Sequence, residues 1–209
     1  MWDQKWLAQF PQVAFPAKAH IISVGEPVRY NYYLMSGVCA KILPLYNGED
    51  YIAHYYYAGK MLGVHLHRYG QASQLDFQAR TACVCYKIPQ QEVAQQIAAN
   101  SRLCYGLLQE LADELDDRGD LSAAQFAGGG ISILSMALKS LAVMQKDGQY
   151  HIPAFFTNVE LSNYCGIHAV TISRLLSKLK SRGILERTKD GIVVYDMEKL
   201  SACIRSEEA

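Results

Sequence analysis

The sequence has neither an excess of one charge nor a long hydrophobic run. Its 209 residues include 20 Lys and Arg against 20 Asp and Glu, a formal net charge of +0 at pH 7. A general polyanion binder would be strongly basic, so any contact with nucleic acid should be confined to one part of the chain. No stretch is apolar for long enough to span a bilayer, and the start, MWDQKWLAQF, lacks the pattern of a signal peptide. These absences predict a cytoplasmic protein.

Cysteine pairs with metal-ligand spacing are also missing. The chain contains no CxxC, which disfavours a zinc or iron–sulfur site built from neighbouring cysteines. Cys83 and Cys85 alternate along an apolar stretch, so both should face the same side of a strand. We interpret the cysteines as reduced, buried thiols. The six are Cys39, Cys83, Cys85, Cys104, Cys165 and Cys203.

Residues 157–195 predict two helices joined by a tight turn. Thr157-x-x-Glu160 is a capping box, so a short helix should begin there and end at Gly166, where glycine takes a left-handed conformation easily. A second helix follows, and its apolar residues recur at the spacing of one buried face. These residues are Ile172, Leu175, Leu176 and Leu179.

The other side of this second helix is small and polar. It carries Ala169, Val170, Ser173, Arg174, Ser177, Lys178 and Ser181. Residues 168–190 contain six Lys or Arg against two acids, which concentrates positive charge in a chain that is neutral overall. After Gly183, two apolar runs flank Lys189-Asp190-Gly191, and Asp-Gly is a hairpin signal. Helix, turn, helix and hairpin together predict a winged helix-turn-helix that contacts DNA. A small α+β module that binds protein is the alternative.

The first half of the chain predicts a different structure. Residues 18–88 contain short strand-like runs separated by glycine turns, the last of them over 75–88, with a short helix before them near Trp6. This pattern indicates an antiparallel barrel or jelly roll. Helical patterns follow at 92–99, 102–126 and 131–145, and a glycine-rich hinge lies between the last two. On the long helix, Leu103, Leu107 and Leu111 predict one apolar face, which Leu108 and Leu115 widen. This face would either form a dimer seam or pack on the chain's own barrel.

In this order of parts the chain resembles the Crp/Fnr family of bacterial transcription regulators. The resemblance rests on Ser23-Val24-Gly25-Glu26-Pro27, Tyr33-Leu34-Met35-Ser36-Gly37, Ala79-Arg80-Thr81-Ala82-Cys83, and the helix-turn-helix with Thr171, Ser173, Arg174 and Leu179-x-x-x-Gly183-Ile184-Leu185. It implies an α+β fold: a double-stranded β-helix (jelly-roll) sensor domain over 1–100, a dimerisation helix over 101–127 and a winged helix-turn-helix over 128–209. It also implies a homodimer on two-fold symmetric operators, with RNA polymerase as a partner.

The helix that would contact DNA departs from the family. Where members often carry Arg and Glu, this sequence has Ala169 and Val170, which can contact only apolar surface such as a thymine methyl group. Arg174 is kept and is the candidate for a polar base contact, while His168 would cap the helix or bind phosphate. An operator unlike the family consensus is therefore expected. The predicted DNA-binding residues are His168, Ala169, Val170, Thr171, Ser173, Arg174, Ser177 and Lys178.

The effector positions depart as well. The family's Gly-Glu pair for the ribose of a cyclic nucleotide aligns with Gly63-Val64, and its Arg-Ser pair for the phosphate falls near Ser73-Gln74. Without the guanidinium and the carboxylate, the charge-assisted hydrogen bonds to cAMP would be lost, so cAMP is not the expected effector. The N-terminal cysteines of the family's oxygen sensors are missing too, which disfavours an iron–sulfur cluster.

The segment from Gly59 to His65 is similar to the haem-binding segment of the family's carbon-monoxide sensors. That resemblance makes His65 a candidate ligand of haem iron, although the Cys two residues before it is replaced by Gly63. Alternatively, His65 is a solvated or capped side chain, and His67 and Arg68 form an anion site. Another small molecule, a redox signal or no effector at all remain open. The candidate effector residues are Gly59, Met61, Leu62, Gly63, Val64, His65, Ser73 and Gln74.

An enzyme of the cupin type is a weaker alternative. A barrel of this kind would need clustered histidine and carboxylate ligands. His65 and His67 are close in sequence, but no further His and Glu follow in the required pattern. The sequence therefore predicts a regulator and not an enzyme.

Overall fold

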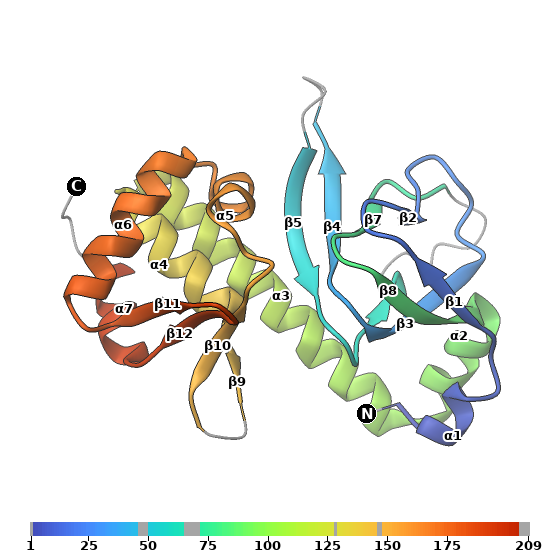
Figure 1. Ribbon diagram of the computed structural model, residues 1–209. Coiled ribbons are helices and arrows are strands. Elements are labelled where there is room, and N and C mark those ends of the chain that lie inside the picture. The colour runs from blue at the N-terminus through green and yellow to red at the C-terminus, as the bar shows by residue number, and fades with distance from the viewer. Residues whose placement is uncertain (1, 46–49, 65–71, 128, 146–147, 205–209) are drawn as a thin grey trace. The chain divides into compact units, whose positions relative to one another are not determined.

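The computed structural model describes all residues except 1, 46–49, 65–71, 128, 146–147 and 205–209 (Figure 1). The chain divides into two compact units, Met1–Glu114 and Leu115–Ala209. The division falls within one helix, α3 (Ser101–Ala127). The first part of α3 therefore belongs to the first unit, and its last part belongs to the second.

Two four-stranded antiparallel sheets form the first unit. One has the order β1 (Gln12–Phe15), β8 (Cys83–Pro89), β3 (Tyr30–Ser36), β6 (Met61–Leu62), and the other β2 (His20–Ile22), β7 (Asp76–Ala79), β4 (Cys39–Pro44), β5 (Asp50–Tyr56). Leu34, Leu62 and Cys85 from the first sheet and Phe77 and Cys39 from the second share one buried cluster. The predicted β-roll is confirmed, with its core between the sheets.

Some strand predictions were wrong in detail. The run over 75–88 is two strands, β7 and β8, which belong to different sheets. Between them, the amides of Arg80 and Thr81 donate to the Val38 carbonyl, while the Val38 amide donates to the Thr81 hydroxyl at 2.9 Å. Gly37 beside this turn has φ +98°, and a Cβ there would lie 2.4 Å from the Ala82 carbonyl oxygen. The short strands β1 and β6 were not predicted.

Three of the four cysteines of the first unit are buried, as expected. Cys83 and Cys85 alternate on the buried side of β8, where they meet Cys39 in the core. Burial raises the pKa of the Cys85 thiol to about 12 and raises that of Cys39 well above its usual value. All six cysteines, each within the described residues, are free, and only Cys104 is half-exposed.

Three helices close one end of the roll. These are α1 (Gln4–Leu7), α2 (Gln90–Ala99) and the first part of α3, whose start is capped by the Asn100 side chain accepting from the Leu103 amide at 3.0 Å. Leu103 and Leu107 are buried against Ile88 of β8 and Val93 of α2. Leu108 and Leu115 were expected to widen this face, but they are 59% and 73% exposed. They lie on a separate face of α3.

The second unit is a winged helix. It contains α4 (Gly130–Leu141), β9 (Val143–Met144), β10 (Tyr150–Pro153), α5 (Asn158–Cys165), α6 (Ala169–Ser181), β11 (Leu185–Thr188), β12 (Gly191–Val194) and α7 (Met197–Ile204). The strands form one sheet in the order β11-β12-β10-β9. Helix α4 ends at Leu141, not at Gln145, because Val143 and Met144 pair with β10. Strands β9 and β10 and the last helix were not predicted.

The predicted glycine hinge lies at the start of α4. Gly128 is outside the described residues, Gly129 caps the helix and Gly130 is its first residue. A Cβ at Gly130 would lie 3.3 Å from Leu175 Cδ1 of α6. Close packing against α6 is therefore one reason for glycine at this position.

Candidate nucleic-acid interface

Helices α5 and α6 form the predicted helix-turn-helix (Figure 1). The Thr157 hydroxyl accepts from the Glu160 amide at 3.2 Å, as the capping box requires. Helix α5 ends at Gly166, which has a left-handed conformation with φ +69° and donates its amide to the Ser162 carbonyl. The turn and both helix boundaries follow from these local signals.

Helix α6 buries one side and exposes the other. Ile172, Leu176 and Leu179 are buried and Leu175 is half-buried. On the other side, Val170 is 75% exposed, and Ser173 and Arg174 are exposed beside it. The exposed members of the predicted set are His168, Val170, Ser173, Arg174 and Ser177, and the half-buried ones are Ala169, Thr171 and Lys178. The helix thus brings all eight predicted residues onto or beside one accessible surface.

Two polar residues of this surface differ in what they can offer DNA. His168 is the N-cap by position, but within the described residues its side chain makes no capping hydrogen bond. Capping by His168 is therefore not observed. The Ser177 hydroxyl donates to the Ser173 carbonyl at 3.0 Å, one turn earlier. Ser177 consequently has only acceptor capacity left for a base or phosphate.

The wing is fixed to the rest of the unit by side chains. Strands β11 and β12 are joined by a two-residue loop, Lys189-Asp190, and Gly191 pairs with Thr188 as the first residue of β12. A Cβ at Gly191 would lie 2.0 Å from the Ile152 carbonyl oxygen of β10, so glycine is required there by close packing. Lys180 of α6 pairs with Glu186 of β11 at 2.7 Å.

Internal partners reduce the number of basic side chains that are available to DNA. The sequence places six Lys or Arg in this region, but Lys180 is paired with Glu186. Arg187 donates to the Asn158 side chain and to the Phe156 carbonyl. Arg174 on α6 and Lys189 in the wing loop are exposed. Arg174 lies on the same surface as Val170 and Ser173, which makes it the principal cation of the α6 surface.

The candidate effector residues have structural roles in the roll. Gly59 occupies the turn before β6 with φ +97°, and Gly63 follows β6 with φ +79°. Met61 and Leu62 are 6% and 0% exposed, and they pack into two different buried clusters. Val64 is half-buried. The predicted haem ligand, His65, lies outside the described residues, as do its neighbours His67 and Arg68.

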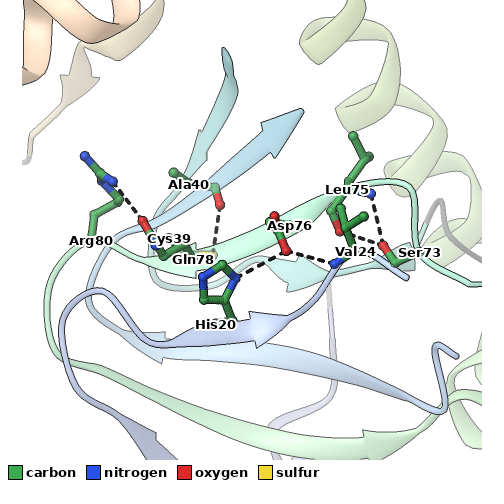
Figure 2. Close-up of polar contacts among 9 residues, drawn as sticks. All are labelled: His20, Val24, Cys39, Ala40, Ser73, Leu75, Asp76, Gln78 and Arg80. Atoms are coloured by element: carbon green, nitrogen blue, oxygen red, sulfur yellow. Dashed lines mark hydrogen bonds and ion pairs between the residues drawn. The ribbon is translucent and has the colours of Figure 1, made fainter. Parts of the chain in front are cut away.

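Ser73 lies near the position at which the sequence comparison placed the family's phosphate-binding arginine. It is 4% exposed, and its hydroxyl donates to the Leu75 carbonyl at 2.6 Å and accepts from the Leu75 amide at 3.2 Å (Figure 2). The Ser73 hydroxyl therefore stabilises its own turn through both hydrogen bonds. The Gln74 side chain is exposed. Nearby, Asp76 accepts from the Val24 amide at 2.8 Å and lies 3.2 Å from His20 Nδ1, which ties β7 to the turn after β2.

A polar cluster that sequence reasoning missed lies between β4, β5 and α3. Lys41 donates to Glu114 Oε1, and the Tyr56 hydroxyl donates to Glu114 Oε2 at 2.8 Å. His54 stands opposite Lys41 in the strand register and against the Tyr56 ring, with ring centroids 4.8 Å apart. Lysine and histidine within apolar strand runs were a weak signal of this cluster. Its acidic partner is 73 residues from Lys41 in the sequence.

The charges in this cluster are linked. Burial alone would raise the pKa of the Glu114 carboxyl, but His54, Lys41 and Tyr56 together hold it below its usual value. Burial lowers the pKa of His54 more than the Glu114 charge raises it, so His54 is neutral at pH 7. Glu114 is therefore ionised and held mainly by Lys41 and Tyr56 under these conditions. The pKa of Tyr56 is raised by burial and by the same carboxylate.

Two family models match consecutive parts of the chain. The cyclic nucleotide-binding domain matches residues 12–100, and the Crp-like helix-turn-helix domain matches residues 101–203. The chain belongs to the Crp/Fnr family of transcription regulators. It is a DNA-binding transcription regulator of the Crp/Fnr type, with the fold described above. No helix in the described part of this regulator combines the length and apolar character needed to cross a membrane.

Known relatives of this Crp/Fnr regulator agree with the assignment. It is 25% identical over 187 residues to the cAMP-activated global transcriptional regulator CRP of Salmonella typhimurium, an alignment that covers 87% of this chain and 88% of the relative. Its fold is similar to FixK2 from Bradyrhizobium japonicum, with a TM-score of 0.75, 18% identity and coverage of 94% and 98%. A CooA mutant from Carboxydothermus hydrogenoformans gives a TM-score of 0.72 at 16% identity, with coverage of 95% and 89%.

Proposed function

We propose that this regulator binds a two-fold symmetric operator as a homodimer and contacts bases through the exposed side of α6. The observation that carries the proposal is the surface formed by Val170, Ser173 and Arg174, which is exposed on a helix whose other side is buried. Arginine can donate two hydrogen bonds to guanine, and valine can pack on a thymine methyl group. Thr171, Ser173 and Lys178 would contact phosphates, which set position rather than sequence.

The homodimer is supported by a second apolar stripe on α3. Residues 105, 108, 112, 115, 119, 122 and 126 alternate in steps of three and four, the spacing of a coiled-coil seam. Tyr105, Leu108, Leu115 and Phe126 of this stripe are 63%, 59%, 73% and 93% exposed. A methyl group added at Gly119 would meet no described atom within 4 Å, so nothing described around it requires glycine. Close approach of a second α3 would explain both the exposed apolar side chains and the glycine.

The functional parts proposed are a sensor over 1–100, a dimerisation helix over 101–127 and a DNA-binding part over 128–209. The β-roll and α2 support the first boundary, and the glycines before α4 support the second. The proposed effector is a molecule other than cAMP. Val64 supplies no carboxylate for a ribose hydroxyl, and the Ser73 hydroxyl is already hydrogen-bonded to the Leu75 backbone. At promoters the dimer would act together with RNA polymerase, as its family implies.

Selection of duplexes from a random DNA library tests this function. We expect enriched sequences that are two-fold symmetric, with half-sites about one helical turn apart. Binding should weaken steeply as the salt concentration rises, because phosphate contacts release counterions. Enrichment of no sequence, together with binding that does not depend on salt, would instead indicate a module that binds protein.

A further inference from the structure

The polar cluster around Glu114 is divided unequally between the roll and the helix. The roll supplies Lys41, His54 and Tyr56, which lie on one face of β4 and β5, the face that also carries Cys39 of the core. Helix α3 supplies the carboxylate of Glu114. The two oxygens of this carboxylate are held separately, one by Lys41 and the other by Tyr56. The strands therefore form a cationic and hydrogen-bonding cradle, and the helix supplies its anion.

Stability alone gives a poor reason for this arrangement. The Lys41 and Glu114 side chains are only 15% and 14% exposed, and taking both charges out of water offsets much of their attraction. Apolar residues of similar size would usually fill the edge of a core at least as well. One turn earlier on α3, Glu110 pairs with Lys60 at 2.7 Å, but these side chains are 26% and 44% exposed. That pair is an ordinary surface ion pair, and the Glu114 cluster differs from it in burial and in its second donor.

We propose that Lys41, His54 and Tyr56 form a binding site for the carboxylate group of a small organic acid, and that Glu114 occupies this site as an internal substitute. A ligand carboxylate would take the place of Glu114 on Lys41 Nζ and on the Tyr56 hydroxyl. Displacement would free α3 from the roll at Glu114, and α3 continues from there to Ala127. The effector role of such a ligand rests on the proposed function, whereas carboxylate binding by the cradle does not.

Acetate binding to a Glu114→Ala variant of the full chain tests the site. Removing the carboxylate should leave space beside Lys41 and Tyr56 that acetate fills, so the melting temperature should rise saturably, by about 3 °C near 100 mM acetate, relative to equal sodium chloride. Glu114→Gln fills the same space and should show no such rise. Adding Lys41→Met to Glu114→Ala should abolish it, and Glu110→Ala should respond to acetate only as to chloride.

Equal responses of Glu114→Ala to acetate and chloride would overturn the proposal, as would an equal acetate response in Glu114→Gln. If Glu114→Ala is unfolded without added anion, the same titration is followed by circular dichroism. Recovery of the folded signal with acetate supports the site, and no recovery contradicts it. No DNA is present in these experiments, so a negative result would say nothing against the proposed DNA-binding function.

Discussion

Arg187 of the wing donates from Nη2 to Oδ1 of Asn158, the first residue of α5, at 3.1 Å. The same nitrogen lies 3.4 Å from the Phe156 carbonyl oxygen. Two segments that are separated by α6 in the sequence are thereby joined at the side of the helix-turn-helix. This contact connects the wing to the start of α5.

Replacing Arg187 with Ala should loosen the wing. We expect a loss of about 1 kcal/mol in the free energy of unfolding, because a partly exposed, charge-assisted hydrogen bond disappears. Operator affinity should fall several-fold. Asn158→Ala should cause a similar loss in urea unfolding, and the double variant should lose little more than either single one. Fully additive losses would show that the two side chains are not coupled, and Lys189→Ala serves as the control for a wing cation without this contact.

Val170 should make operator binding sensitive to single methyl groups. Deoxyuridine has the hydrogen-bonding groups of thymidine but lacks the 5-methyl group. Replacing the thymine that Val170 contacts by uracil should weaken binding about fourfold, the value of one buried methyl group. The Val170→Ser variant should bind both operators equally in an electrophoretic shift assay. If no thymine in the selected half-site shows this effect in the wild type, the assignment of Val170 is wrong.

The stability of the first unit should fall in two steps as the pH is lowered. The pKa of His54 is lowered from 6.5 because burial disfavours its charged form. The unfolded chain therefore takes up this proton at a higher pH than the folded chain, and stability drops below about pH 6.5. The pKa of Glu114 is lowered from 4.5, so its contribution is full above that value and is lost as the pH falls through the lower folded pKa.

Urea unfolding between pH 8 and pH 3 measures both steps. His54→Gln should remove the first step and weaken the second, because His54 helps to lower the pKa of Glu114. Glu114→Gln should reduce the second step and keep the first. His168→Gln, which replaces an exposed histidine of the second unit, is the matched control and should leave the profile of the first unit unchanged. If the first step were unchanged in His54→Gln, the loss of stability near pH 6.5 would come from a group other than His54.

Leu115→Glu should separate the dimer without unfolding the chain. The Leu115 side chain is 73% exposed, so the substitution costs the folded protomer little. In a two-fold seam, however, it would place two carboxylates against apolar side chains. Size-exclusion chromatography with light scattering should give a dimer for the wild type and for Asp113→Asn, which lies off the stripe, and a monomer for Leu115→Glu. A Leu115→Glu dimer would place the interface elsewhere.

The helix-turn-helix could be predicted from the sequence because its signals are local. A capping box, a glycine C-cap and apolar spacing set α5 and α6 within about 25 residues, and the structure confirms them. Strands β7 and β8 could not be separated, because the turn between them is held by Val38, some 43 residues away. The Glu114 cluster could not be predicted for the same reason, because Glu114 lies 73 residues from Lys41 in the sequence. Strands β1 and β6 are too short for a periodic signal, and β6 has only two residues.

The exposure of the candidate residues on α6 was also easier to predict than the environment of those in the roll. The exposed side of a helix follows directly from the spacing of its buried side, which is why Arg174 and Val170 were placed correctly on one surface. The effector residues were taken from aligned positions, and alignment carries no information on packing. Met61 and Leu62 are core residues, and the Ser73 hydroxyl is used by its own turn.

The contribution of Arg174 to operator binding tests the central claim most directly. Affinity of wild type and Arg174→Ala is measured on the selected operator and on a scrambled duplex at one fixed salt concentration, with the dimer checked by light scattering. A lost bidentate base contact should weaken operator binding by about 1–3 kcal/mol while changing the affinity for scrambled duplex far less. If the dimeric Arg174→Ala variant kept the full preference for the operator, α6 would not be contacting the bases through Arg174, and the account would be contradicted.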